Sequence, residues 1–159
     1  MEFRKIIVPL DGSEFAESVL PCVKALTSSC SVADIELISV VPPLEMHYKA
    51  AVPLDSGEEE QINRAEIKGA EEYLESVKKT LQAPNLNVTA RVIRGKPAQA
   101  LAAYLESGAG DILVMATHGR SGPSRWVMGS VADRLVQVSP IPVLLVRPPN
   151  LRSGLPPPK

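Results

Sequence analysis

The sequence predicts a single α/β domain in which a five-stranded parallel sheet carries helices on both faces. Three observations predict this class. The 159 residues fit one domain of ordinary size. Five short apolar runs alternate along the chain with amphipathic stretches of helical period, and no hairpin signal joins two of the runs. Strands separated by helices are linked by right-handed crossovers, which places them parallel in one sheet.

The composition excludes several classes of protein. Hydrophobic residues make up 45% of the chain and charged residues 22%, which is enough apolar surface for a core and excludes disorder of the whole chain. Seventeen Lys and Arg against eighteen Asp and Glu leave a net charge of −1, which argues against a nucleic-acid binder. No apolar run approaches the roughly 18 residues of a membrane-spanning helix. The chain enters a strand-like segment at once, so we expect no secretory signal and a cytoplasmic protein.

The first apolar run, Lys5–Leu10, is the first predicted strand and ends at the turn Asp11-Gly12-Ser13. Ser13 has the residue type of a helix N-cap, and apolar residues recur at helical spacing from Phe15 to Leu26. Pro21 lies inside this pattern and should either kink the helix or delay its start. The second predicted strand is Ile35–Val41, closed by two prolines.

A long helix and a third strand follow. The stretch Leu44–Asp55 has no period and is predicted as a loop, and Ser56 with Glu59 has the spacing of a capping box at a helix start. One largely apolar helical face is then predicted, consisting of Ile62, Ala65, Glu66, Ala70, Tyr73, Leu74, Val77 and Leu81. Asn87–Gly95 alternates apolar and polar residues, as expected for a strand with one solvent-exposed face or for a strand at the edge of the sheet.

The last part of the chain completes the alternation. Pro97 opens a short helix that ends at Gly108. Asp111–Thr117 is apolar almost throughout and predicts a central strand buried on both faces. A glycine-containing connection and a further helix lead to the fifth strand, Pro142–Val146. The predicted domain spans residues 1–148, and the proline-rich residues 149–159 form a tail.

Neither a disulfide nor a protein-bound metal is expected. Cys22 and Cys30 are eight residues apart, which matches no metal or redox motif, so two reduced thiols are predicted. The polar neighbourhood of Met46, His47 and Tyr48 also lacks the ligand set of a zinc site.

Two segments carry the chemistry-bearing residues. In open α/β sheets, ligands bind beyond the carboxyl ends of the strands, where the segments Pro9–Ser13 and Ala116–Ser130 are predicted to lie. Gly119 and Gly129 are separated by nine residues, and Ser130 begins a helix. Glycine lets backbone amides close on an anion, and a helix N-terminus supplies unpaired N–H groups, so this segment could capture phosphate. An ordinary helix cap is the open alternative.

Three segments together resemble the universal stress protein family. They are KIIVPLDGSEFAESVL, the Gly95-Lys96-Pro97 segment, and ATHGRSGPSRWVMGSVADRLVQVSPIPVLLVRP, and the likeness runs from about residue 3 to 148. The nucleotide-binding branch of that family carries G-x-x-G, nine residues, then G-[ST]. Gly119, Gly129 and Ser130 fit this motif, whereas Ala116 stands where its first glycine would be and adds one methyl group. The resemblance implies the strand order 3-2-1-4-5.

The resemblance also implies an adenine-nucleotide site. Its residues would be Pro9, Leu10, Asp11, Val40, Met115 and Ala116 around the base and sugar, and Gly119, Gly129, Ser130 and Val131 around the phosphates. Each has a structural alternative: Asp11 could serve only its turn, and Val40 and Met115 are core candidates in any case. His118 could donate to a phosphate oxygen or be a structural hydrogen-bonding group, and Arg125 could reach the phosphates or stay solvated.

Three functions remain open from the sequence. The first is a regulatory, stress-response protein that binds ATP, or ADP or AMP, with Mg²⁺ on the phosphates. The second is a slow ATPase, because the phosphate loop shows no obvious carboxylate base. The third is a scaffold that needs no nucleotide. In the implied strand order the apolar run Val143–Val146 is an edge strand, so a homodimer through this edge is expected under all three.

Overall fold

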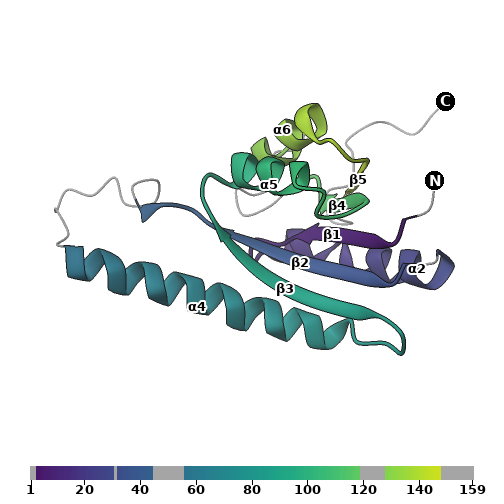
Figure 1. The fold of residues 1–159 in the computed structure, drawn as a ribbon, viewed down its shortest axis with the longest axis horizontal. Coiled ribbons are helices and arrows are strands. Elements are labelled where there is room, and N and C mark those ends of the chain that lie inside the picture. Colours follow the sequence, from purple (N-terminus) through teal and green to yellow (C-terminus); the bar gives the residue numbers. More distant parts are fainter. Residues whose placement is uncertain (1–2, 31, 45–55, 119–127, 148–159) are drawn as a thin grey trace, which may run out of the picture.

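The computed structural model describes residues 3–30, 32–44, 56–118 and 128–147. Its strands are β1 (Lys5–Pro9), β2 (Asp34–Val41), β3 (Asn87–Arg94), β4 (Ile112–Ala116) and β5 (Val143–Val146). All pairings between them are parallel, and the sheet has the order β3-β2-β1-β4-β5 (Figure 1). The predicted sheet and its strand order are therefore confirmed.

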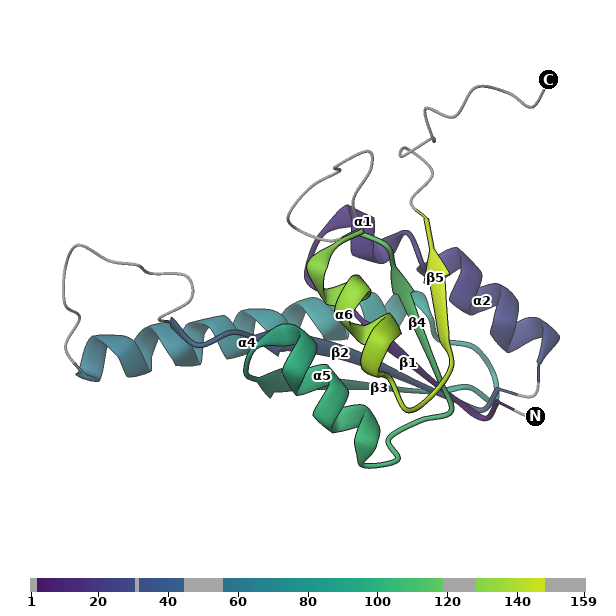
Figure 2. The ribbon, with the colours of Figure 1, turned by 90° about the horizontal axis from the view of Figure 1, so that it is seen from above.

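Helices cover both faces of this sheet, as predicted. They are α1 (Glu14–Glu17), α2 (Leu20–Ser29), α4 (Ser56–Thr80), α5 (Pro97–Glu106) and α6 (Ser130–Val138). Figures 1 and 2 show α2 and α4 on one face and α5 and α6 on the other. The sheet is thus the middle layer of three, and its two faces build separate cores.

The strand period distributes side chains between these cores. On β1, Ile6 and Val8 join the core under α2 and α4, whereas Ile7 joins the core under α5 and α6. All five residues of β4 are buried, which confirms the prediction of a central strand. β3 lies at an edge and alternates in exposure, also as predicted.

The first helical stretch is split in two. Ser13 caps α1, because its Oγ accepts a hydrogen bond from the N–H of Ala16 at 3.1 Å. The chain then leaves the helix, and α2 starts at Leu20 with Pro21 in its first turn. The first-turn N–H groups have no partner inside a helix, so a proline there costs no hydrogen bond. Of the two expectations for Pro21, the later start is the correct one.

Other boundaries differ slightly from those expected. α4 begins at Ser56 itself, and the capping bond of the Ser56 side chain lies outside what the structure describes, as do the loop residues 45–55 and the tail 149–159. Ala65 is exposed, so it does not belong to the apolar face of α4. β5 begins at Val143, one residue after the expected Pro142, whose carbonyl accepts a hydrogen bond from the N–H of Leu113.

Both cysteines are free thiols, as expected, but Cys22 is only partly buried and Cys30 is exposed. Within the described ranges, no three His, Cys, Asp or Glu side chains gather as metal ligands. Among the same residues, no helix combines the length and apolar character needed to span a bilayer.

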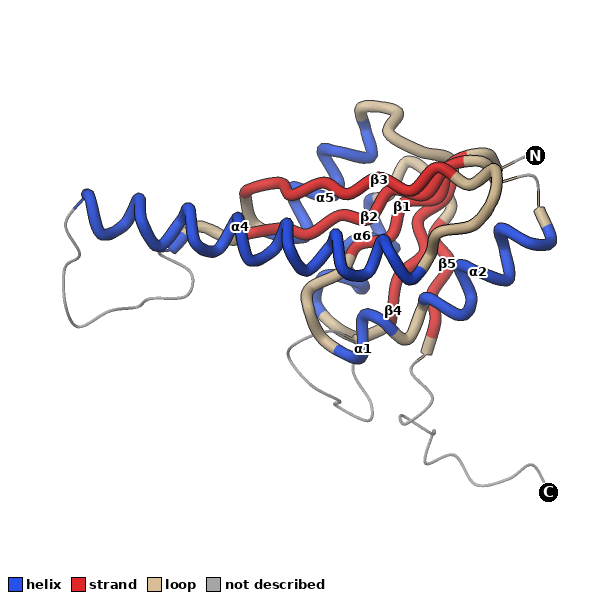
Figure 3. Tube along the Cα trace, turned by 90° about the horizontal axis from the view of Figure 1, so that it is seen from below, coloured by secondary structure: helices blue, strands red, loops and turns tan. Residues whose placement is uncertain are grey.

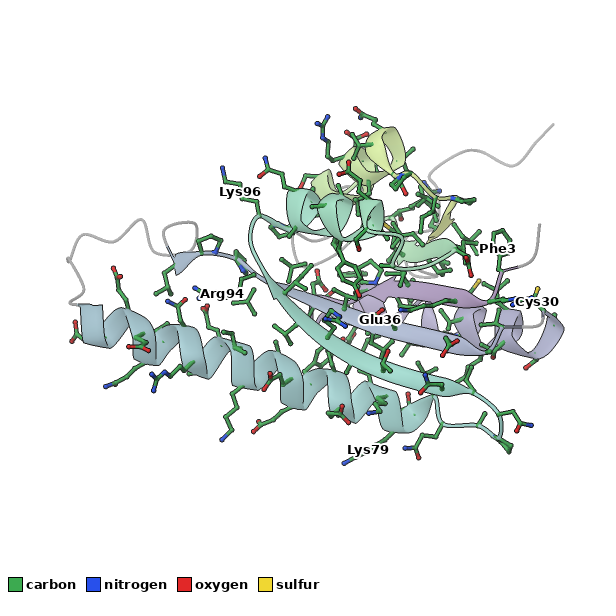
Figure 4. All side chains as sticks on the ribbon, in the orientation of Figure 1. Phe3, Cys30, Glu36, Lys79, Arg94 and Lys96 are labelled. Carbon is green, nitrogen blue, oxygen red and sulfur yellow. The ribbon has the colours of Figure 1, made fainter. Side chains whose placement is uncertain are left out.

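One charged side chain is buried inside the sheet layer. Glu36 on β2, labelled in Figure 4, is 2% exposed and points to the α5 side. Its carboxylate accepts from the Nζ of Lys5 at 2.6 Å, the Nε of Arg91 at 2.7 Å and the hydroxyl of Tyr104 at 2.8 Å. The Arg91 guanidinium also lies 5.4 Å from the centre of the Tyr104 ring. Three strands and α5 are therefore joined at one carboxylate.

This cluster predicts a pH-dependent stability. Burial raises the pKa of Glu36, but the hydrogen bonds from Lys5, Arg91 and Tyr104 outweigh burial and leave the pKa below its usual value. A carboxyl whose folded pKa is lowered stabilises the fold above its unfolded pKa of about 4.3, and this contribution is lost as the pH falls through the folded pKa. We expect Glu36→Gln to cost about 2 kcal/mol of unfolding free energy at pH 7.

Urea unfolding at pH 7 and at pH 3 measures this effect. The difference between wild type and Glu36→Gln should shrink at the lower pH, because pH 3 lies below the unfolded pKa of the carboxyl, where the stabilisation from the lowered folded pKa is being lost. A difference that is equal at the two pH values would show that the charge of Glu36 does not contribute to stability.

Candidate functional site

A cavity of about 760 Å³ opens at the carboxyl ends of β1, β2 and β4. Its volume lies in the range of small-molecule sites, roughly 300–1,000 Å³. β1 lies between β2 and β4, so the chain leaves the sheet in opposite directions on the two sides of this strand. Such a reversal of strand order leaves a crevice between the outgoing loops, and ligands of open α/β sheets bind there.

The structure brings the predicted site residues together along this cavity. The residues of the predicted site that line it are Pro9, Leu10, Asp11, Val40, Met115, Ala116, His118, Gly129, Ser130 and Val131. The remaining two, Gly119 and Arg125, lie outside the described residues. Segments from four different parts of the chain therefore meet at one place, and their roles toward a ligand stay predictions.

Asp11 stabilises the turn that follows β1, which was the structural alternative for this residue, and it also lies on the cavity wall. Its Oδ1 accepts from the N–H of Ser13 at 3.0 Å and from the hydroxyl of Ser13 at 2.6 Å. Gly12 between them has a φ of +82°, a left-handed conformation that glycine adopts without steric cost. Asp11 is an exposed residue, and it lines the cavity as well as holding the turn.

The amino end of α6 closes the cavity on the α5 side of the sheet. Gly129 is the N-cap of this helix, Ser130 is its first residue, and no side chain of the described residues caps it. The N–H of Gly129 donates to the carbonyl of Thr117 at 2.8 Å, which holds the helix start against the end of β4. N–H groups of the first helical turn have no carbonyl partner within the helix. Ser130 through Ala132 therefore present amide donors and a positive helix end to the cavity, whereas the N–H of Gly129 is used by Thr117.

His118, Val40 and Met115 each have packing roles as well. His118 is buried, and its Nδ1 lies 2.9 Å from the hydroxyl oxygen of Thr117, so the ring is fixed at the end of β4. Met115 belongs to the core under α5 and α6, and Val40 packs against the same core. These three side chains therefore have the structural roles that were their alternatives, and all three residues also line the cavity.

The opposite wall is a part of the site that the sequence did not indicate. Glu66, Gly69, Ala70 and Tyr73 of α4 line the cavity, although three of them were assigned only to a core-facing helix stripe. Figure 3 shows why: α4 lies across β2 and β3 and continues past their carboxyl ends, so the same stripe that covers the sheet also walls the cavity. A glycine in the middle of a helix was the available signal, because it destabilises a helix without an evident local reason.

The charges of the cavity are divided between its two sides. Asp11 and Glu66 contribute carboxylates on the β1 and α4 side, and the α6 terminus is positive. Tyr73 lies among these groups: burial first, then the carboxylates of Glu17 and Asp11, raise the pKa of its hydroxyl. The phenol therefore stays neutral throughout the physiological pH range.

Comparison with known proteins gives a consistent result. Residues 2–147 match the model of the Universal stress protein family. Universal stress protein MJ0531 of Methanocaldococcus jannaschii is 27% identical over 148 residues, which cover 93% of this chain and 84% of that protein. Universal stress protein MJ0577 of the same organism is 28% identical over 158 residues, covering 93% and 97%. The solved structure of MJ0577 has a TM-score of 0.78 to this chain at 27% identity, covering 92% of this chain and 97% of that one.

Two further solved structures share the fold and contain a nucleotide. A universal stress protein in complex with cAMP is 18% identical, with a TM-score of 0.58 and coverage of 93% of this chain and 99% of that one. A universal stress protein family protein of Arabidopsis thaliana with AMP bound is 16% identical, with a TM-score of 0.56 and coverage of 91% of both chains.

Proposed function

The chain belongs to the universal stress protein family, and we propose that it is a regulatory protein of the cytoplasm that binds an adenine nucleotide. ATP with Mg²⁺ is the proposed ligand, and ADP and AMP are its competitors for the same site. The observation that carries the proposal is the cavity at the carboxyl ends of β1, β2 and β4, with a helix N-terminus on one side. The relatives that contain cAMP and AMP support the same class of ligand.

The proposal assigns the two halves of the nucleotide to the two sides of the cavity. Phosphates carry the negative charge, so they belong at the helix start formed by Gly129, Ser130 and Val131, where the amides of Ser130 and Val131 and the helix dipole favour anions. Gly119, His118 and Arg125 are proposed to complete the phosphate end. The base and sugar then lie toward the β1 and β2 ends, among the predicted wall residues Pro9, Leu10, Asp11, Val40, Met115 and Ala116.

Hydrolysis is proposed to be absent or very slow. Attack on the γ-phosphate needs a water that is positioned in line with the leaving oxygen, together with charge stabilisation. The carboxylates of Asp11 and Glu66 lie on the β1 and α4 side, away from the amides proposed to hold the phosphates. Mg²⁺ is proposed to be held by phosphate oxygens, where it would neutralise charge.

Calorimetric titration of the purified protein with Mg-ATP, ADP and AMP tests this function. We expect saturable binding of Mg-ATP, and phosphate release close to that of a buffer control. The absence of heat at high-micromolar protein with all three nucleotides would leave the nucleotide-independent scaffold as the function.

A homodimer through β5 is the proposed assembly. Each residue of β5 is partly exposed although all four are Val or Leu, because the strand ends the sheet and its faces are incompletely covered. Pairing with the same strand of a second copy would satisfy the free edge and bury these side chains. Light scattering at micromolar concentration should give the mass of a dimer, and Leu144→Lys should shift it toward the monomer. A monomeric wild type contradicts this assembly.

A further inference from the structure

The α4 wall, defined as Glu66, Gly69, Ala70 and Tyr73, faces the cavity from the opposite side to α6. These positions have the spacing i, i+3, i+4 and i+7, so they form one stripe on the helix surface. Glu66 is partly exposed and is the charged member of this stripe. The stripe therefore offers a carboxylate, a flat patch of backbone and small side chains, and an aromatic ring in sequence along the wall.

The chemistry of a carboxylate limits what it can recognise. An ionised carboxylate only accepts hydrogen bonds, and it repels phosphate oxygens. With the phosphates at the α6 terminus, Glu66 faces the uncharged half of an adenine nucleotide. The donors on that half are the ribose hydroxyls and the exocyclic amine of the base. Either type could donate to a carboxylate at this place.

Gly69 shows that the wall leaves room for a close approach. A Cβ built on Gly69 would meet no described heavy atom within 4 Å, so the protein does not require glycine there for its own packing. Glycine inside a helix is less stable than alanine. The absence of a side chain at Gly69 would allow a flat group of a ligand to pack directly on the backbone of α4. Glu66 lies one turn away on the same face of the helix.

We propose that Glu66 is a specificity-determining residue of this site, which accepts a hydrogen bond from a ribose hydroxyl or from the exocyclic amine while the nucleoside packs on Gly69. The inference rests on the proposed function, and it adds α4 to the ligand contacts. It assigns selection for the nucleoside to α4 and affinity for the phosphates to α6. Free inorganic polyphosphate should therefore gain nothing from Glu66.

Titration of Glu66→Ala with Mg-ATP tests the assignment, with Glu71→Ala as the matched control. Glu71 is an exposed carboxylate on α4 that does not line the cavity, so both variants remove one negative charge from the same helix. Loss of a charge-assisted hydrogen bond should weaken Mg-ATP binding by about tenfold to 100-fold in Glu66→Ala. Removal of negative charge alone would strengthen binding of a polyanion, so the expected sign is opposite to the general electrostatic effect. Glu71→Ala should bind as wild type does.

Nucleotide analogues identify the donor. We expect wild type to bind 2′-deoxy-ATP or 3′-deoxy-ATP more weakly than ATP if a ribose hydroxyl donates, and inosine triphosphate more weakly if the amine donates. Glu66→Ala should lose that discrimination, because the acceptor is gone. Equal losses for ATP and every analogue, or unchanged affinity of Glu66→Ala for ATP, would overturn the assignment.

Gly69→Ala tests the packing step independently. The added methyl group meets no described atom and faces the cavity, and alanine is more stable than glycine inside a helix. The melting temperature should therefore rise by about 2 °C. Affinity for Mg-ATP should nevertheless fall about tenfold. Unchanged affinity would contradict nucleoside packing on α4. If the wild type binds no nucleotide, the proposed function itself is contradicted. If the wild type binds and the α4 variants bind equally well, only the assignment of Glu66 and Gly69 is contradicted.

Discussion

A Gly129→Val variant is expected to bind Mg-ATP about 100-fold more weakly than wild type while it keeps its fold. Gly129 is the N-cap of α6, with φ −58° and ψ 141°, and valine adopts this extended conformation readily. Its branched side chain would extend over the amides of Ser130 and Val131, where the phosphates are proposed to lie. Loss of one or two charge-assisted hydrogen bonds costs about 3 kcal/mol of binding free energy, which corresponds to roughly 100-fold weaker binding.

Two related variants make this measurement interpretable. Gly129→Ala adds only one methyl group and should fall between wild type and Gly129→Val in affinity. Gln137→Val introduces the same side chain at an exposed position near the other end of α6 and should bind as wild type does. Equal calorimetric affinity of Gly129→Val and wild type, with unchanged circular dichroism, would remove the α6 terminus from the site.

A large effect on stability is also expected for Gly110→Ala, which should lower the unfolding free energy by about 1–3 kcal/mol. A Cβ on Gly110 would lie 2.6 Å from Cγ1 and 2.8 Å from Cδ1 of Ile7. Ile7 is fully buried in the core under α5 and α6, so it cannot turn away into solvent. The contact is close because the neighbouring Asp111 carboxylate accepts from the N–H groups of Arg4 and Lys5 and ties this loop to β1.

A double-mutant cycle tests the stated cause. Ile7→Ala alone should cost about 2–5 kcal/mol through the cavity it leaves. If the clash with Ile7 is the reason for the loss in Gly110→Ala, the double variant should be more stable than the sum of the single losses predicts. Urea unfolding measures all four proteins. Additive losses would show that the contact with Ile7 is not the cause of the lower stability of Gly110→Ala.

Much of the architecture could be predicted from local patterns. Asp111–Thr117 is apolar almost throughout, which is typical of a strand covered on both faces, and β4 is buried along its whole length. Pro21 could be placed only as a disturbance of a helix, because a proline is compatible both with a kink and with a first turn. The break before Leu20 places Pro21 in the first turn of α2, and helix propensity alone does not distinguish this arrangement from a kink.

The sequence also indicated one side of the candidate site. Asp11 and Gly129 follow strands, and the carboxyl ends of parallel strands meet at one edge of the sheet, so their meeting follows from chain order and topology. The four residues on α4 could not be found in this way. Ala70 and Tyr73 have the same helical period whether they cover a core or line a cavity.

By itself, the sequence therefore determined the fold class, the strands and the segments that follow them, because apolar period and turn residues are local properties. Only the tertiary structure decided that the stripe from Glu66 to Tyr73 borders open space. The reason is geometric: α4 is longer than the strands it covers, and the point at which it passes their ends depends on its packing against β2 and β3.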